Sequence, residues 1–274
     1  FNFVFFALLY ILLEIFSGSL FFKGKLNCHY LLCNQKYTFK NNLYEPYNDI
    51  KYSKDKYGFR GREKNINDID VLVLGGSTTD ERYLNLKDTW TERLEQKINN
   101  NLNKKIDIVN AGIDGQSTYG HIHNFRYWFP KISGLKVDYI LFYVGINDFY
   151  IKHKNSYDDL ILKEKNLKNL IKSKSIIFDI FRMTQGVLFA NAYGLNHNIS
   201  NEINEFSFSN WVSKPYLNNH YDLMEEKLKS YEKRLNILCD ETYNIGAKPI
   251  FVSQSSRRTY HYLDNKLIGI PGSS

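Results

Sequence analysis

The sequence has few of the residues that build metal centres, disulfide frameworks or nucleotide-binding loops. Its 274 residues include three cysteines and seven histidines, with no Cys-x-x-Cys pair and no His-x-x-x-His spacing. These absences exclude the common zinc motifs and an extensive disulfide scaffold. The chain also has no P-loop Gly-Lys-Ser/Thr and no Gly-x-Gly-x-x-Gly, so the usual phosphate- and dinucleotide-binding loops are excluded. Cys28 and Cys33 lie five residues apart and could pair in an oxidising compartment.

An Arg-rich patch and a nucleic-acid-binding module are absent as well, although the chain is basic. The formal net charge is +7 and the sequence pI is about 9.0, but the lysines are scattered. We therefore expect no nucleic-acid partner, and attraction at most to anionic phospholipid headgroups or acidic glycans. With 43% hydrophobic residues the chain can build one sizeable core, so one domain with additional segments is expected.

The first 22 residues form the longest apolar run, interrupted chiefly by Asn2 and Glu14 and closed by Lys23 and Lys25. About 20 apolar residues suffice to cross a bilayer, and one mid-membrane acid costs only about 3 kcal/mol on insertion scales. We therefore predict a transmembrane anchor or signal segment over residues 1–22. A cleaved signal peptide and a buried core helix are the alternatives, and the first residue is not Met.

From residue 67 onward, short apolar runs alternate with segments of helical periodicity. This alternation predicts a mostly parallel sheet covered by helices. Residues 23–66 are predicted to be an irregular connector, 67–274 a single α/β domain, and 151–220 an insertion that serves as a lid, substrate wall or packing subdomain. The predicted strands are 69–74, 106–109, 137–144 and 249–253, and the predicted helices are 89–102, 119–129 and 221–243.

Three small motifs follow the first three predicted strands. They are Gly75-Gly76-Ser77-Thr78-Thr79, Asn110-Ala111-Gly112-Ile113-Asp114-Gly115 and Gly145-Ile146-Asn147-Asp148. Each alone is ordinary turn chemistry. Because ligands bind at the carboxyl ends of parallel strands, we expect the three motifs to gather at one edge of the sheet.

In this order and at these strand ends, the motifs resemble those of the SGNH hydrolases, also called GDSL esterases. The resemblance covers about residues 57–253 and extends to Tyr57-Gly58-Phe59-Arg60-Gly61, which is similar to the lead-in of a bacterial, membrane-anchored branch. It implies a three-layer α/β/α fold of the flavodoxin-like kind. It also implies Ser77 as the catalytic nucleophile, with Ser77, Gly115 and Asn147 forming the oxyanion hole. No cofactor and no metal are implied.

These roles agree with the chemistry of ester cleavage. The tetrahedral intermediate carries a negative oxygen that needs fixed hydrogen-bond donors about 3 Å away. Two backbone N–H groups, at Ser77 and Gly115, and the side-chain amide of Asn147 could converge on it. Glycine at position 115 would let the backbone approach without a Cβ in the way.

The base that would activate Ser77 is missing from its expected place. The family supplies a histidine from an Asp-x-x-His motif near the end of the domain, and none of the seven histidines (29, 121, 123, 153, 197, 220 and 261) has Asp three residues before it. Either the sequence is truncated at its C-terminal end, which we favour, or the triad has been lost. The 274 residues alone are therefore expected to be inactive or very weak as an esterase.

The leading functional prediction is a membrane-anchored serine esterase that removes acyl groups, plausibly acetyl, from a glycan or lipid. The resemblance to members that act on cell-surface material implies an extracytoplasmic domain, whereas Lys23 and Lys25 alone would favour the cytoplasmic side after the anchor. One alternative is an O-acyltransferase acting on cell-surface polysaccharide through the same acyl-serine. The other is a non-catalytic binding module with a vestigial site.

Overall fold

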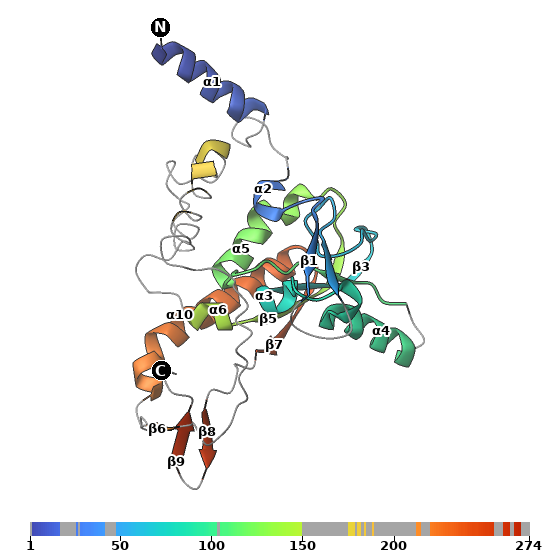
Figure 1. Cartoon of the computed structure of the whole chain (residues 1–274), viewed down its shortest axis with the longest axis vertical. Helices are drawn as coiled ribbons and strands as arrows, with labels where there is room; N and C mark the ends of the chain where they lie inside the picture. The colour runs from blue at the N-terminus through green and yellow to red at the C-terminus, as the bar shows by residue number, and fades with distance from the viewer. Residues whose placement is uncertain are drawn as a thin grey trace.

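The chain is built on a four-stranded, entirely parallel sheet. The computed structural model describes residues 2–16, 26, 28–41, 48–102, 105–149, 175–178, 180, 181, 184, 188, 212–214, 220–254, 260–263 and 266–269. The sheet order is β4-β3-β5-β7, and Figure 1 labels β3, β5 and β7 among these strands. Its strands are β3 (Ile69–Gly75), β4 (Ile108–Asn110), β5 (Val137–Val144) and β7 (Lys248–Ser253). The prediction of a mixed α/β chain with a parallel sheet is confirmed.

All four predicted strands exist, and their boundaries differ by two residues at most. The central strands β3 and β5 are rich in Val, Ile and Leu, with aromatic residues in β5, as expected for strands that are largely covered on both faces. In β3, Leu72 and Leu74 are fully buried. The register pairs Leu72 with Val109 on one side and with Ile140 on the other, which places the ends of β3, β4 and β5 together.

Helices pack against both faces of this sheet. Leu72, Leu74 and Phe142 belong to one core cluster with Ile122 of α5 (Thr118–Tyr127) and Leu238 of α10 (His220–Asn244). Because successive strand residues point to opposite faces, Val73 faces away from that cluster, towards the side where α4 (Trp90–Leu102) contacts β4. The predicted helices at 89–102, 119–129 and 221–243 correspond to α4, α5 and α10. Pro130 does not simply end α5, because it lies within a short 3₁₀ helix, η2 (Phe129–Lys131).

The segment predicted to be an irregular connector contains regular structure. A short helix α2 (Cys28–Leu31) precedes an antiparallel hairpin of β1 (Lys36–Lys40) and β2 (Asp49–Ser53). Cys28 and Cys33 are joined by a disulfide. Leu31, Ile50, Tyr52 and Phe59 are buried, so this segment forms part of the domain's packing.

Helix α1 (Asn2–Phe16) is the described part of the predicted transmembrane segment. It has 15 residues, or roughly 22 Å at 1.5 Å per residue, against a hydrocarbon core of about 30 Å. None of the described helices combines the length and the apolar character needed to cross a bilayer. The predicted transmembrane helix is therefore not supported by this part of the chain, and residues 17–22 lie outside the described residues.

Little of the predicted insertion at 151–220 falls within the described residues. Residues 176–178 are helical, and β6 (Val212–Lys214) pairs with β9 (Lys266–Gly269), which also pairs with β8 (Tyr260–Leu263). The domain boundaries proposed from the sequence stay predictions.

Candidate active site

Ser77 stands at the first position of a one-turn helix at the end of β3. Helix α3 (Ser77–Asp80) starts directly after Gly76, whose carbonyl accepts hydrogen bonds from Thr79 N and Asp80 N at 3.0 Å each. The backbone N–H of Ser77 has no acceptor within the helix, as for every first-turn residue. The side chain of Ser77 is exposed, and no hydrogen bond joins its hydroxyl to another described residue. An exposed hydroxyl and a free N–H thus lie together at this strand end.

The second predicted motif lies beside this turn. Its backbone continues the hydrogen bonding of β4 to β3 beyond the end of β4. Ala111 N donates to Val73 O at 2.8 Å, and Ile113 N donates to Gly75 O at 3.0 Å. Gly115 then has a φ of +72°, in the region that favours glycine, and a Cβ there would meet nothing within 4 Å. Position 115 is therefore open towards solvent. Glycine is favoured there because of the positive φ, and not because a side chain would clash with a neighbouring residue.

Asn147 of the third motif reaches into the same place from helix α6 (Ile146–Phe149). Its Nδ2 donates to Gln116 O at 2.9 Å, and a Cβ built on Gly76 would lie 2.4 Å from the same nitrogen. The amide thus touches the backbone immediately before Ser77. Because an amide nitrogen carries two hydrogens, the second remains available as a donor. The structure brings Ser77 and Asn147 together, and Gly115 lies one residue before the carbonyl that Asn147 contacts.

A buried polar cluster fixes the turn that carries Ser77. Asp80 is 1% exposed and accepts hydrogen bonds from the Tyr52 hydroxyl at 2.9 and 3.2 Å, with Lys54 Nζ at 3.7 Å. Arg60 Nε donates to Asp80 O at 3.2 Å, and its guanidinium lies over the Tyr52 ring. Burial and the neighbouring Asp80 raise the pKa of Tyr52, so its hydroxyl stays a donor. Nothing near Asp80 in the sequence indicates these distant partners.

A second buried cluster holds the turn that carries Asn147. Asp148 accepts hydrogen bonds from Thr118 N, at 3.2 Å to Oδ2, and from Arg234 Nη2, at 3.1 Å to Oδ1. The Thr118 hydroxyl also contacts Asp148 and accepts from Arg234 Nε at 2.6 Å. Arg234 and Asp148 are almost fully buried side chains, so each satisfies the other's charge. The residue after Asn147 is thereby fixed to α5 and α10.

Gln254 connects the fourth strand to both turns. Its Oε1 accepts a hydrogen bond from Ile146 N at 3.1 Å, and its Nε2 donates to the Thr78 hydroxyl at 2.6 Å. The Trp90 indole N–H donates to Thr78 O at 2.9 Å from the other side. Sequence reasoning missed Gln254, although its place directly after a predicted parallel strand was the signal that could have identified it.

No histidine is placed against Ser77 within the described residues. The side chains of His121 and His123 are described, and those of the other five lie outside. His121 is fully buried on α5, and burial lowers its pKa to about 3, so it is a neutral, internal side chain. His123 packs against the Tyr127 ring at 4.5 Å. Neither histidine is hydrogen-bonded to Ser77.

Two further titratable groups near the turns, Glu81 and Tyr231, have raised pKa values. Burial raises the pKa of Glu81, directly after α3, to about 7, although its carboxylate accepts a hydrogen bond from Trp90 N at 2.8 Å. Burial and Asp148 raise the pKa of Tyr231 to about 12. The Tyr231 hydroxyl donates to Val144 O at 3.3 Å, directly before the third motif.

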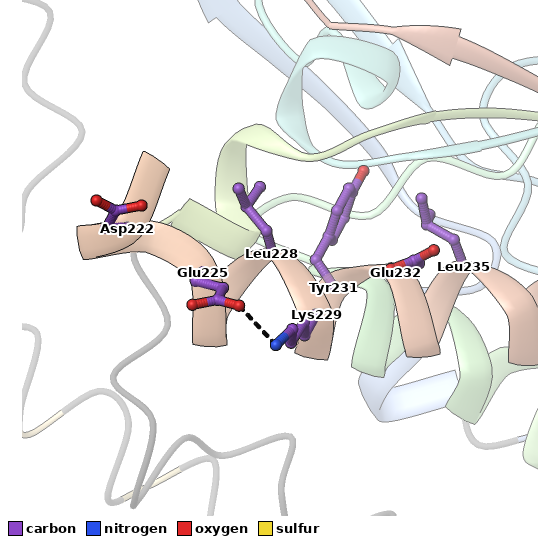
Figure 2. Close-up of a pocket in the computed structure, with 7 residues that line it drawn as sticks. All are labelled: Asp222, Glu225, Leu228, Lys229, Tyr231, Glu232 and Leu235. Atoms are coloured by element: carbon purple, nitrogen blue, oxygen red, sulfur yellow. Dashed lines mark ion pairs between the residues drawn. The ribbon is translucent and has the colours of Figure 1, made fainter. Parts of the chain in front are cut away.

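Tyr231 also lines a groove of about 400 Å³ along α10 (Figure 2). Figure 2 shows Leu228, Tyr231 and Leu235 pointing to the same side of the helix, with the exposed Glu225–Lys229 ion pair beside them. A second, more polar groove of about 640 Å³ lies between β2, η1 (Leu86–Asp88) and α4. Neither groove is lined by Ser77, Gly115 or Asn147. Among the described residues, no group of three or more His, Cys, Asp or Glu side chains could hold a metal ion.

Comparison with known proteins gives structural likenesses only. The chain matches no protein-family model and no curated protein sequence. Among solved structures it is similar to AlinE4, an SGNH-hydrolase family esterase, at 15% identity and a TM-score of 0.28, covering 61% of this chain and 97% of that one. It is also similar to a variant of Axe2, an acetyl xylan esterase from Geobacillus stearothermophilus, at 16% identity and a TM-score of 0.28, covering 68% and 78%. LAE5, an alpha/beta hydrolase enzyme from a lake metagenome, gives 15% identity and a TM-score of 0.29, with 68% and 79% covered. TM-scores this far below 0.5 establish neither a common fold nor a common activity.

Proposed function

We propose that the chain is a serine esterase of the SGNH type, which removes acyl groups from a glycan or lipid through an acyl-serine. The observation that carries the proposal is the position of the Asn147 amide, which lies against the backbone of Gly76, one residue before Ser77, and donates to Gln116 O, one residue after the second motif. If the three motifs were only turns, nothing would require the Asn147 amide to lie beside Ser77. The two buried clusters that hold these turns give the rigidity that catalytic donors need.

In the proposed reaction, Ser77 Oγ attacks the carbonyl carbon of the ester and its proton passes to a base. The carbonyl oxygen becomes an oxyanion that accepts hydrogen bonds from Ser77 N–H, Gly115 N–H and the free hydrogen of Asn147 Nδ2. The tetrahedral intermediate then expels the alcohol, which takes up the proton, and leaves the acyl group on Ser77. Water attacks this acyl-serine in the second half-reaction and releases the acid.

We further propose that the base is a histidine outside the described residues, and that the domain works outside the cytoplasm. The Cys28–Cys33 disulfide supports the second point, because disulfides persist in oxidising compartments. An acetylated surface glycan would be a substrate available there.

The test is ester hydrolysis by the complete natural protein in detergent, with p-nitrophenyl acetate and an acetylated glycan as substrates. We expect Ser77→Ala to abolish turnover and Asn147→Ala to lower kcat by about a hundredfold or more, as for other oxyanion donors. Asn101→Ala, at an exposed position on α4, is the matched control and should behave as wild type.

Three results would contradict the proposal or a part of it. Undiminished hydrolysis by Ser77→Ala would remove Ser77 as nucleophile. Wild-type turnover by Asn147→Ala, with Ser77→Ala inactive, would leave a serine enzyme whose oxyanion is held by other donors. A complete protein without hydrolase activity on either ester would support the binding-module alternative.

A further inference from the structure

Helix α1 exposes apolar side chains around most of its circumference. Its exposed side chains are Val4, Phe5, Phe6, Leu8, Leu9, Tyr10, Ile11, Leu12, Leu13 and Phe16, each 37% exposed or more. At about 100° per residue, these positions occupy every direction except one narrow sector. Ala7 and Glu14, seven residues apart and therefore on the same side, lie in that sector, and Glu14 is fully buried.

Glu14 is buried because a segment distant in sequence supplies hydrogen-bond donors to it. Its carboxylate accepts hydrogen bonds from the Ser175 hydroxyl at 2.5 Å, from Ile176 N at 3.2 Å and from Ile177 N at 3.4 Å. Ser175 Oγ also accepts from Phe178 N at 3.2 Å, as an N-cap does. The single acid of α1 thus satisfies the first N–H groups of the helical residues 176–178.

The segment held by Glu14 is itself apolar on its exposed side. Ile180, Phe181 and Leu188 are 45%, 60% and 63% exposed, whereas Ile176, next to the Glu14 contact, is buried. The Thr184 hydroxyl donates to Ile180 O at 2.9 Å, so a nearby polar group is satisfied within the segment. In Figure 1, α1 and this yellow segment lie on the same side of the sheet domain.

The all-round exposure identifies the occupant of this surface. A groove on a partner protein would cover one side of α1, whereas here apolar side chains lie on nearly all sides. A helix that is apolar all round is stable only in a core or in lipid. Lipid also requires that polar groups and charges be satisfied internally, and the Glu14 contacts pair the one acid of α1 with a hydroxyl and two backbone N–H groups of the other segment. The net charge of +7 favours anionic headgroups.

We propose that the segment with Ile180, Phe181 and Leu188 is a second lipid-contacting segment, fastened to α1 by Glu14, so that the chain meets a phospholipid bilayer with two segments rather than one. This inference is independent of the proposed esterase activity. Removing Glu14 would leave the N–H groups at 176 and 177 without their acceptor and would separate the two segments.

The test places an environment-sensitive NBD probe on single cysteines of the complete protein, in a Cys239→Ser background without reductant. The probe positions are Phe181→Cys on the second segment, Leu9→Cys on α1 and Leu102→Cys, an exposed position at the end of α4, as control. With vesicles of phosphatidylcholine and phosphatidylglycerol containing doxyl lipids, we expect quenching at 9 and at 181, and none at 102. Quenching of the probe at 9 together with no quenching of the probe at 181 would overturn the proposal.

Glu14→Ala then tests the fastening in the same assay. We expect it to reduce quenching at 181 at least twofold while quenching at 9 persists, and Glu14→Gln, which keeps an acceptor oxygen, to retain most of it. Unchanged quenching at 181 in Glu14→Ala would refute the role of Glu14. Equal loss at both probes would refute it as well, because it would mean that the substitution acts on α1 itself.

Discussion

Replacing Gly112 with alanine should destabilise the protein through one steric contact. A Cβ at this position would lie 2.4 Å from Asp80 N, 2.8 Å from Thr79 C and 2.9 Å from Asp80 Cα. These distances are about 1 Å shorter than optimal non-bonded contacts between heavy atoms. All three atoms are backbone, so no side chain can rotate away.

The helix turn that would have to move is held by several groups. Asn110 Nδ2 donates to Thr79 O at 2.7 Å, Arg60 Nε donates to Asp80 O at 3.2 Å, and the Tyr52 hydroxyl binds the Asp80 carboxylate. Overpacking costs about 1–3 kcal/mol, and each weakened hydrogen bond adds about 1 kcal/mol. We therefore expect Gly112→Ala to lower the free energy of unfolding by about 3 kcal/mol.

Urea unfolding followed by circular dichroism, in detergent at constant composition, measures this difference. Gly115→Ala is the matched control, because its Cβ would meet no atom within 4 Å and only its φ of +72° is unfavourable. A left-handed conformation costs a non-glycine residue about 1–2 kcal/mol. If Gly112→Ala were as stable as wild type, or more stable than Gly115→Ala, the close packing of the second motif against α3 would be refuted.

Three further predictions concern stability and thiol chemistry. Arg234→Met leaves the buried Asp148 carboxylate without its partner, so it should lower the free energy of unfolding by about 3–5 kcal/mol in the same assay. An unchanged free energy of unfolding would contradict the burial of this pair. Glu81 binds a proton in the folded state between its ordinary pKa of 4.5 and its raised value of about 7, so stability should fall as pH rises through that window. Glu81→Gln should flatten this slope, and an unchanged slope would refute the assignment. Iodoacetamide should modify only Cys239 in the unfolded, unreduced chain, and all three cysteines after reduction, which mass spectrometry distinguishes.

The sheet could be predicted from the sequence because its strands are locally distinctive. Short runs such as Ile69–Leu74 and Val137–Val144 are rich in β-branched and aliphatic residues and end at glycine, which is typical of buried parallel strands. The convergence of Ser77 and Asn147 followed from a topological rule about strand ends, not from any local signal. The fold and the approximate place of the site were therefore predictable.

The groups that hold the site were not predictable, since they depend on pairing between distant residues. Nothing near Asp80 in the sequence indicates that Tyr52 and Lys54 would bury it. The hairpin was missed although Lys36–Lys40 (Lys-Tyr-Thr-Phe-Lys) and Asp49–Ser53 (Asp-Ile-Lys-Tyr-Ser) both alternate polar and apolar residues, which is the pattern of a half-buried strand. Glu14 was treated as a cost within an apolar helix, and its donors lie 161 or more residues away.

The order of the strands has a consequence for synthesis of the chain on the ribosome. β5 lies between β3 and β7, yet Gln254, directly after β7, follows Ile146 by 108 residues. At roughly 5–20 residues per second, one side of β5 waits on the order of 5–20 s for its neighbour. During that interval the turn carrying Ser77 lacks only the hydrogen bond from Gln254 to Thr78, whereas the turn carrying Asn147 lacks both Gln254 and Arg234. The nascent domain thus carries an open strand edge, which chaperones could bind, and the proposed oxyanion site is complete only when translation has passed β7.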